Sequence, residues 1–243
     1  MKALILSSGG NDSTSILSKA VTDYGTKEVA TVSIYYGQRH DKEIESARKI
    51  ADYYGLAHYE FDLSKIYQYS NSAMLKQGEA IKESSYAEQL EETKGEVPVN
   101  TYVPFRNGLF LSIVTALAIE IEASEVWYGA HADDAAGNAY PDCSIEFVDA
   151  MAAAIKEGTG GQVVLSAPVV DKNKSEVVAI GLENHAPLWL TWSCYKGEDK
   201  QCGLCGTCRD RIEAFKQQHV IDPVPYAIDI DWTDCEELSY ENI

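Results

Sequence analysis

The sequence predicts an α/β fold with a doubly wound, mostly parallel sheet, followed by a metal-binding loop and a final helix. Short apolar runs typical of buried strands alternate with segments that have the 3.6-residue period of amphipathic helices. Strand, helix, strand, helix, strand is the order in which a parallel sheet with helices on both faces begins. Four cysteines crowded between positions 194 and 208 predict the metal-binding loop.

Length and charge limit what the chain can be. Its 243 residues suffice for one large domain or for a domain with an appendage. The net charge of -18 disfavours direct nucleic-acid binding, because a strongly acidic surface repels polyanions. No apolar stretch is long enough to cross a membrane, and the apolar run after Met1-Lys2 is too short for a signal peptide. We therefore expect a cytoplasmic protein.

The expected organisation has three parts. Residues 1–190 should form the main α/β domain, and residues 191–220 a cysteine-rich element packed on it. Residues 221–243 should form an acidic tail, because no Lys or Arg follows Lys216. We interpret this tail, and the acidic run over residues 79–96, as solvated.

The first expected strand ends in a small polar loop that leads into a helix. Residues 3–6 are apolar, the sequence Ser-Ser-Gly-Gly-Asn-Asp-Ser-Thr follows, and Ile16 and Leu17 begin a helical period. A glycine turn at a helix N-terminus favours anions, because free backbone N–H groups and the helix dipole both attract negative charge. The patterns G-x-x-x-x-G-K-[ST] and G-x-G-x-x-G are absent. A Gly-Gly pair that merely connects strand to helix is the alternative, and the flanking elements favour the anion site.

The second strand is expected over residues 27–36, and a third over residues 58–62, with a helix between them. Ligands of doubly wound sheets bind at the carboxyl ends of the strands. The loops after the first two strands should therefore face one cleft, which makes Arg39 and His40 candidates for the nucleotide. Each could equally be an exposed loop residue.

The middle of the chain contains an irregular stretch and a strongly apolar helix. Residues 64–100 are polar and acidic, and should be loop or lid with a short helix near residues 86–92. The helix expected from Gly108 to about Glu122 has an apolar face wide enough for burial on more than one side. Arg106 and Asn107 lie at its N-terminal edge, where an anion would be stabilised.

The second half of the predicted sheet follows. A strand over residues 125–130 leads into His131-Ala-Asp-Asp134. The two adjacent acids there could bind a metal ion or accept hydrogen bonds from a ligand, and the alternative is that they cap a helix. Next we expect an amphipathic helix that contains Val148 and Ile155, and then a strand over residues 162–167. A turn and a helix over residues 175–184 follow.

The cysteine spacing C-x7-C-x2-C-x2-C supplies four thiolates within one loop. Zinc binds such a closed tetrahedral set of four thiolate ligands, and an iron–sulfur cluster is the alternative. Two disulfides are disfavoured because disulfides are rare in cytosolic proteins. Closeness of all four in one glycine-containing loop favours zinc. The metal would hold the last helix, about residues 207–218, against the domain. Cys143 and Cys235 stand apart and are interpreted as ordinary residues.

Residues 8–13 resemble, residue for residue, the pyrophosphate loop Ser-Gly-Gly-x-Asp-Ser of the adenylating PP-loop ATPases. With the cysteine cluster, they make the chain resemble the 7-cyano-7-deazaguanine synthase (QueC) family from Leu6 to about Arg211. The blocks that carry the resemblance follow one another in order: Ser8–Thr14, Tyr36–His40 with Glu43, Val103–Asn107, Tyr140–Cys143, Pro168 with Asn173–Glu176, and Cys194-Tyr195 with the other three cysteines and Arg211. Residues 131–139 depart from it, because they lack the Thr-Asp-Phe-Ser-Gly of many members, and the sequence after Gln218 lies outside it.

The resemblance implies an adenine nucleotide α-hydrolase-like (PP-loop) fold and a ligase reaction. Such enzymes convert 7-carboxy-7-deazaguanine and ammonia to the nitrile 7-cyano-7-deazaguanine in queuosine-type deazapurine biosynthesis. The carboxylate and then the amide are adenylated, with release of AMP and pyrophosphate. The resemblance implies ATP, Mg²⁺ and Zn²⁺ as cofactors and small molecules as partners. The wide apolar helix faces permit a homodimer.

The resemblance also implies roles for individual residues. Asp12 would contact Mg²⁺, while Arg106 and Lys174 would act as cations on the substrate carboxylate or the phosphates. Nucleotide contacts are expected from Ser7, Ser8, Gly9, Gly10, Asn11, Asp12, Ser13, Thr14, Ser15, Ile16 and Leu17. Substrate candidates are Arg39, His40, Asn107, Asp134, Asp142 and Tyr195, and the zinc ligands would be Cys194, Cys202, Cys205 and Cys208.

Three other functions fit parts of the sequence. A tRNA thiolase or lysidine-type ligase shares the loop, but the acidic charge argues against tRNA and the loop has no cysteine to carry sulfur. A QueC-like enzyme that joins the activated deazaguanine to another amine is not excluded. A zinc ribbon for binding protein or nucleic acid is disfavoured, because few Lys or Arg surround the cysteines and Trp189 and Trp192 lie nearby.

Overall fold

The fold is a five-stranded parallel sheet covered by helices on both faces. The computed structural model describes residues 1–39, 41–81, 86–92, 94, 96–196 and 199–238. The candidate His40 therefore lies outside the described residues. The strands are β1 (Ala3–Leu6), β2 (Val29–Tyr35), β3 (Ala57–Asp62), β4 (Glu125–Trp127) and β5 (Val164–Ser166). They pair in the order β3-β2-β1-β4-β5, and each pairing is parallel. The predicted doubly wound sheet is confirmed.

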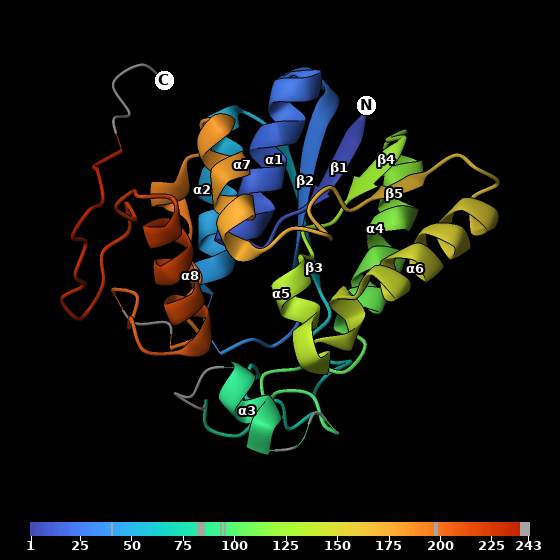
Figure 1. Ribbon diagram of the computed structural model, residues 1–243. Helices are drawn as coiled ribbons and strands as arrows, with labels where there is room; N and C mark the ends of the chain where they lie inside the picture. The colour runs from blue at the N-terminus through green and yellow to red at the C-terminus, as the bar shows by residue number, and fades with distance from the viewer. Residues whose placement is uncertain (40, 82–85, 93, 95, 197–198, 239–243) are drawn as a thin grey trace.

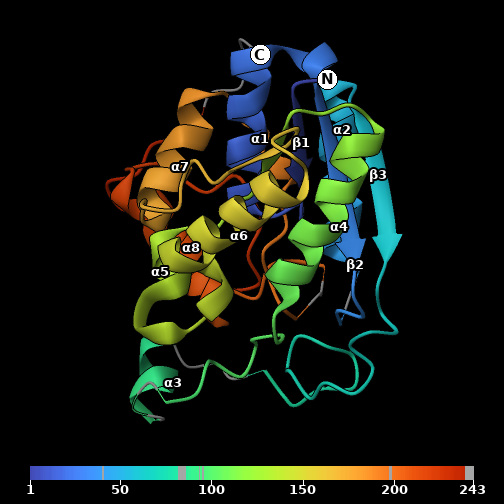
Figure 2. The same ribbon diagram turned by 90° about the vertical axis from the view of Figure 1, so that its right-hand side faces the viewer.

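Helices form the two outer layers of the sandwich. In Figures 1 and 2, α1 (Asn11–Tyr24), α2 (Lys42–Tyr54) and α7 (Lys174–Glu183) cover one face of the sheet, and α4 (Arg106–Glu120) and α6 (Ile145–Gly158) the other. Alternate residues of β1 face the two layers. Ala3 and Ile5 pack with Ile16 and Leu17 of α1, while Leu4 packs in the cluster that contains Leu111 of α4. Burial on both faces explains why the central strand β1 is apolar throughout.

The remaining helices are short or lie outside these two layers. The predicted short helix is present as α3 (Tyr86–Glu92), within an otherwise irregular connection from β3 to α4. This connection lies at the end of the molecule toward which the β2 and β3 arrows point (Figure 2). Short helices occur at α5 (Ala132–Ala135) and, as single 3-10 turns, at Thr26–Glu28, Ala136–Asn138, Pro141–Cys143 and Leu188–Leu190. No helix in the described part of the chain has the length and apolar character needed to span a membrane.

The strand order reverses between β1 and β4, and the loops that follow these two strands meet there. Gly129, just after β4, packs on the first turn of α1: a Cβ at this position would lie 3.4 Å from the Ile16 Cδ1 and 3.5 Å from the Ser13 backbone nitrogen. In parallel sheets of this type, the crevice at such a reversal is where ligands bind. The topology therefore places residues 7–13 and 128–134 around one crevice.

The C-terminal part corrects the expectation of a solvated tail. Helix α8 (Gly206–Gln217) packs on α7, and Phe215 is fully buried there. Residues 221–238 then run back along α8. Asp222 is buried and accepts two hydrogen bonds from the buried Arg211, at 2.6 and 2.9 Å, and Trp232 packs on the cluster that contains Phe215. This segment is acidic, but it is tied to the domain by a buried ion pair.

Candidate active site

A cavity opens at the carboxyl ends of β1, β2 and β4. It is bounded by the loop after β1, the first turns of α2 and α4, the segment after β4, the start of α7 and the segment 192–195. Its walls are of two kinds. The ionisable lining residues are Asp12, Tyr36, Glu43, Arg106, Tyr128, His131, Asp133, Asp134, Tyr140, Cys143, Lys174, Tyr195 and Asp210. The apolar lining residues are Leu6, Ile34, Ile44, Met74 and Phe110.

The loop after β1 is held by its own serines. The Ser13 hydroxyl accepts a hydrogen bond from the Ser8 backbone N–H at 3.2 Å, and the Gly10 N–H donates to the Ser8 hydroxyl at 3.2 Å. Helix α1 begins directly after Gly10, so its first N–H groups point toward the cavity. The arrangement is an anion site, in which backbone donors and the helix dipole act together.

The predicted nucleotide contacts divide into two groups. Ser7, Ser8, Gly10, Asn11, Asp12 and Ser13 line the cavity, whereas Gly9, Thr14, Ser15, Ile16 and Leu17 do not. The Thr14 hydroxyl donates to the Gly10 carbonyl at 2.7 Å, and that of Ser15 donates to the Asn11 carbonyl at 3.0 Å. Ile16 and Leu17 are fully buried in the core beneath the loop. These residues support the loop from below, because successive residues of a helix point in different directions.

Gly9 faces helix α2 rather than the cavity. Its φ is +77°, and a Cβ there would lie 2.2 Å from the Glu43 carbonyl oxygen and 2.6 Å from the Ala47 nitrogen. The Gly9 carbonyl accepts a hydrogen bond from the Trp192 N–H at 2.9 Å. Glycine is therefore required at this position for the close approach of α2, not for the approach of a phosphate.

Lys174 and Asp12 join the start of α7 to the start of α1. The Lys174 ammonium donates a short hydrogen bond to the Asp12 carboxylate. His131 lies alongside, with its Nε2 3.7 Å from Asp12 and 3.3 Å from Asp134. Burial opposes the charged form of Asp12, but Lys174 and His131 outweigh it and lower the pKa of Asp12. Burial likewise opposes the charged form of Lys174, and Asp12 and Asp134 outweigh it and raise the pKa of that ammonium.

Arg106 extends into the opposite side of the cavity from the first turn of α4. Its guanidinium donates to the Tyr36 hydroxyl at 3.1 Å and also lies 5.2 Å from the Tyr36 ring centroid. Asn107 beside it is buried, and its backbone N–H donates to the buried Asp142 carboxylate at 2.9 Å. Asp142 does not line the cavity. It fixes the N-terminus of α4 and so supports Arg106 and Asn107, which do.

The other substrate candidates have different positions. Tyr195 lines the cavity, with its hydroxyl 3.4 Å from that of Tyr140, and Asp134 lines it next to His131. Arg39 is not a lining residue: its guanidinium donates to the backbone carbonyls of Ala73, Gly78 and Glu79. The interpretation of Arg39 as a ligand contact is corrected accordingly. It holds the irregular connection against the loop after β2.

The structure adds lining residues that sequence reasoning did not select. Glu43 and His131 are the most informative, since both are ionisable, and burial raises the pKa of Glu43 to about 7. Asp210 of α8 also lines the cavity, and burial raises its pKa to about 6. The signal for Glu43 was its place in the first turn of the helix after β2. His131 could have been selected because it follows β4 directly.

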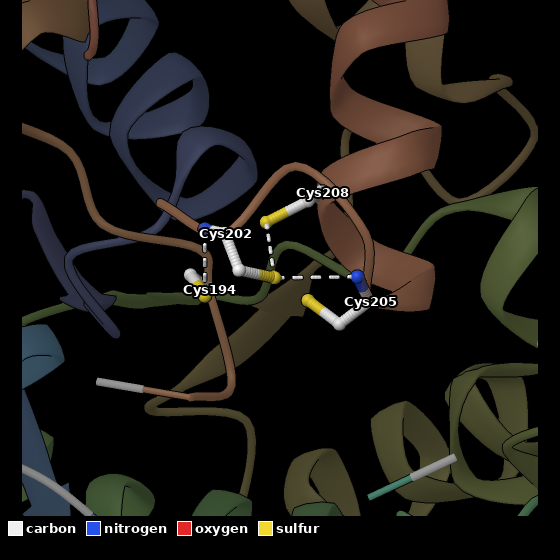
Figure 3. A group of neighbouring side chains, drawn as sticks. All are labelled: Cys194, Cys202, Cys205 and Cys208. Carbon is white, nitrogen blue, oxygen red and sulfur yellow. Dashed lines mark hydrogen bonds between the residues drawn. The ribbon is translucent and has the colours of Figure 1, made fainter. Parts of the chain in front are cut away.

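The four clustered cysteines fit a metal ion. Their Sγ atoms all lie within 4.8 Å of one another, and those of Cys202 and Cys208 are 3.9 Å apart (Figure 3). Tetrahedral zinc with Zn–S bonds of about 2.3 Å needs sulfur–sulfur distances of about 3.8 Å. Backbone N–H groups of Cys202 and Cys205 donate to the sulfurs of Cys194 and Cys202, which favours thiolates. All four are free and buried, so the disulfide alternative does not hold in this structure.

A doubly wound parallel sheet, with a glycine-containing anion loop at its strand-order reversal, defines an α/β protein of the nucleotide-binding PP-loop class. The model of the family "Queuosine biosynthesis protein QueC" matches residues 2–219, and the chain belongs to this family. It is 42% identical to a 7-cyano-7-deazaguanine synthase of Caldicellulosiruptor saccharolyticus, over 96% of this chain and 98% of that relative. It is 38% identical to a 7-cyano-7-deazaguanine synthase of Archaeoglobus fulgidus, over 99% of this chain and 96% of that relative.

A solved structure, NMN synthetase from Francisella tularensis, is similar at a TM-score of 0.48 and 16% identity, and the match covers 79% of this chain and 65% of that one. A likeness of this degree supports no inference about function.

Proposed function

We propose that this chain is a 7-cyano-7-deazaguanine synthase that uses ATP to convert 7-carboxy-7-deazaguanine and ammonia to the nitrile. The observation that carries the proposal is the 42% identity to an enzyme of that name over almost the full length of both chains. The cavity supports it, because one crevice combines an anion loop, partly buried cations and apolar side chains. A small anionic heterocycle and a nucleotide need these three features.

The chemistry requires activation of a carboxylate, whose oxygen is a poor leaving group at neutral pH. Attack of the carboxylate on the α-phosphate of ATP would form an acyl-adenylate and release pyrophosphate. The backbone N–H groups of the first turn of α1, which begins at Asn11, would hold that pyrophosphate. Ammonia would displace AMP to give the amide, and a second adenylation at the amide oxygen would allow AMP to leave with formation of the nitrile. Positioning and charge neutralisation would supply most of the rate.

The partly buried Lys174–Asp12 ion pair supplies the charges that this step needs. With its pKa lowered, Asp12 is a carboxylate at neutral pH, and it is the residue we propose as a Mg²⁺ contact. Mg²⁺ bound there would neutralise charge on the phosphates. Lys174 stays protonated and can act on the same oxygens. Arg106 is placed to hold the substrate carboxylate or the α-phosphate, with Asn107 and Tyr195 as neighbouring polar contacts.

We infer that zinc holds the four cysteines in a structural role. Segment 192–195 both lines the cavity and contains Cys194, so the metal would fix one wall of the cavity. A thiolate site of this kind also fits a reducing compartment such as the cytoplasm. The homodimer that the apolar helix faces permit stays a prediction, which size-exclusion chromatography with light scattering tests.

The test of the proposed function is a single incubation. The purified protein, 7-carboxy-7-deazaguanine, ammonium, Mg²⁺ and ATP should give the nitrile together with AMP and pyrophosphate. Omission of ammonium should abolish nitrile formation and serves as the control. Formation of ADP and phosphate, or absence of turnover with this acid, would contradict the proposal. A different amide as the product would instead indicate conjugation to another amine.

A further inference from the structure

Glu43 is a carboxylate of the cavity that the proposed chemistry leaves without a role. It lies in the first turn of α2, is half-buried and lines the cavity. Among the residues that the structure describes, its side chain has no hydrogen-bond or ion-pair partner. Two of the acids on the other side are engaged: Asp12 accepts from the Lys174 ammonium, and Asp133 accepts from the Lys174 backbone N–H at 2.7 Å.

The backbone fixes where Glu43 sits. Its carbonyl oxygen lies against Gly9, at a position where a Cβ would come within 2.2 Å of it. Gly9 in turn accepts a hydrogen bond from Trp192. The first turn of α2 thus packs against the pyrophosphate loop, which is itself hydrogen-bonded to the segment that contains Cys194. A side chain anchored in this way has a defined distance to the phosphate end of the cavity.

Apolar and aromatic side chains line the same cavity as Glu43. Leu6, Ile34 and Ile44 are among them, and the Tyr36 ring, whose hydroxyl interacts electrostatically with Glu43, lies 5.6 Å from that of Phe110, centroid to centroid. Such a surface suits the faces of a planar bicyclic heterocycle. Burial there raises the pKa of Glu43 to about 7, against the opposing charge of Arg106. A carboxylate in this environment gains most from a ligand that brings hydrogen-bond donors with it.

The donor pattern of the two possible heterocycles decides which one Glu43 suits. An ionised carboxylate is acceptor-only and presents two oxygens side by side. Deazaguanine carries a ring N1–H next to its 2-amino group, which gives two adjacent donors. Adenine carries its 6-amino donor next to the N1 acceptor, whose lone pair would face one of the carboxylate oxygens. In its ionised form Glu43 therefore complements deazaguanine and not adenine.

We propose that Glu43 is a specificity-determining residue that accepts hydrogen bonds from N1–H and the 2-amino group of the deazaguanine substrate. The inference rests on the proposed function, and it goes further by placing the heterocycle at the α2 side of the cavity. The carboxylate to be activated then points from Glu43 toward the pyrophosphate loop. Ligands that lack the 2-amino group would lose one of the two bonds.

The first test is steady-state kinetics of Glu43→Gln. The amide keeps the shape of the side chain but replaces one acceptor by a donor, so the KM for 7-carboxy-7-deazaguanine should rise about 10- to 100-fold, as for loss of a paired base contact. The KM for ATP should stay within about twofold of the wild-type value. Glu45→Gln, an exposed acid two positions on, is the matched control and should change neither constant. An unchanged KM for the acid, or a rise confined to ATP, would overturn the proposal.

The second test compares two ligands and begins with the wild-type protein. Binding of 7-cyano-7-deazaguanine and of its analogue without the 2-amino group is measured by calorimetry on the wild type and on Glu43→Gln. The wild type should prefer the amino-bearing ligand by at least about tenfold, and Glu43→Gln should lose most of that preference. Equal preference in both proteins would overturn the role of Glu43 while leaving the nitrile-forming activity in place. A wild-type protein that neither binds nor converts these deazaguanines would refute the proposed function and this inference together.

Discussion

Lys174 donates a hydrogen bond to Asp12 across 162 positions of the sequence, and this contact joins the first turns of α7 and α1. It brings a cation to the helix whose N-terminus holds the anion loop. Neither residue is placed by local sequence, because the contact depends on the order of β1, β4 and β5 in the sheet. The Lys174–Asp12 contact therefore holds a cation beside the loop that would bind phosphate, where it can neutralise the charge of the phosphate.

Replacement of Lys174 by Met should remove catalysis. The variant loses a cation that would act on the phosphates, and it leaves the partly buried Asp12 carboxylate without its main partner. We expect AMP formation to fall about 100- to 1000-fold, as for loss of one preorganised charge contact in an active site. Quench-flow measurement of AMP gives the value. Lys172→Met is the control, because Lys172 is half-exposed and, among the described residues, its ammonium pairs with the exposed Asp171 alone, at 3.3 Å. Equal losses in the two variants would show that Lys174 has no special role.

Replacement of Gly9 by Ala should destabilise the fold by pushing α2 away from the loop. The new Cβ would overlap the Glu43 carbonyl oxygen, and the φ of +77° adds strain. Gly55→Ala is the matched control, since Gly55 has a φ of +66° and a Cβ added there would meet no atom within 4 Å. The control should cost about 1–2 kcal/mol from backbone strain, and Gly9→Ala about 1–3 kcal/mol more from overpacking. Chemical denaturation measures both, and equal values would mean that α2 adjusts freely.

The pH dependence of stability should reveal the charge of His131. Burial opposes the charged imidazole, but Asp134 and Asp12 outweigh burial and raise the pKa of His131 above its ordinary value of 6.5. When the pKa of a group is higher in the folded state than in the unfolded state, its contribution to stability is complete at pH values below the unfolded-state pKa. That contribution is lost as the pH rises through the folded-state pKa. The excess stability of wild type over His131→Gln should therefore be largest below pH 6.5 and shrink above it. Urea denaturation across this range tests the prediction. The exposed His185→Gln should show no such trend, and an excess that grows with pH would indicate a neutral imidazole.

Metal analysis tests the cysteine cluster directly. We expect about one zinc per chain by mass spectrometry of the purified protein, because four thiolates complete one tetrahedral site. Cys205→Ser should lose the metal and much of the soluble protein, since structural zinc contributes directly to folding. Cys235→Ser is the control, because Cys235 stands outside the cluster. Iron with a visible absorption band would contradict zinc, and a stable metal-free Cys205→Ser that lacks only activity would contradict a structural role.

The elements that the sequence predicts well are those that local pattern determines. The alternation of apolar runs and helical periods is enough for five strands and their helices, and the short helix expected near residues 86–92 is present as α3. The cysteine spacing likewise predicts a cluster, because four residues within one short loop cannot lie far apart.

The elements that escape sequence analysis depend on contacts between distant segments. Gly9 is among the nucleotide contacts expected from the sequence, but a side chain there would meet α2, which begins more than 30 residues later. Arg39 has the chemistry of an anion contact, yet it is satisfied by carbonyls of residues 73, 78 and 79. Asp222 lies in an acidic segment interpreted as solvated, although it pairs with the fully buried Arg211. Local composition contains no information about these partners.

The most direct test of the adenylation mechanism follows the oxygen atoms of the substrate. With both carboxylate oxygens of 7-carboxy-7-deazaguanine labelled with ¹⁸O, each adenylation would transfer one substrate oxygen to the phosphate of AMP. We predict two AMP per nitrile, each with one ¹⁸O, and pyrophosphate without label, as read by mass spectrometry. Label in inorganic phosphate accompanied by ADP, or label released to water with unlabelled AMP, would contradict adenylation of the carboxylate and the amide.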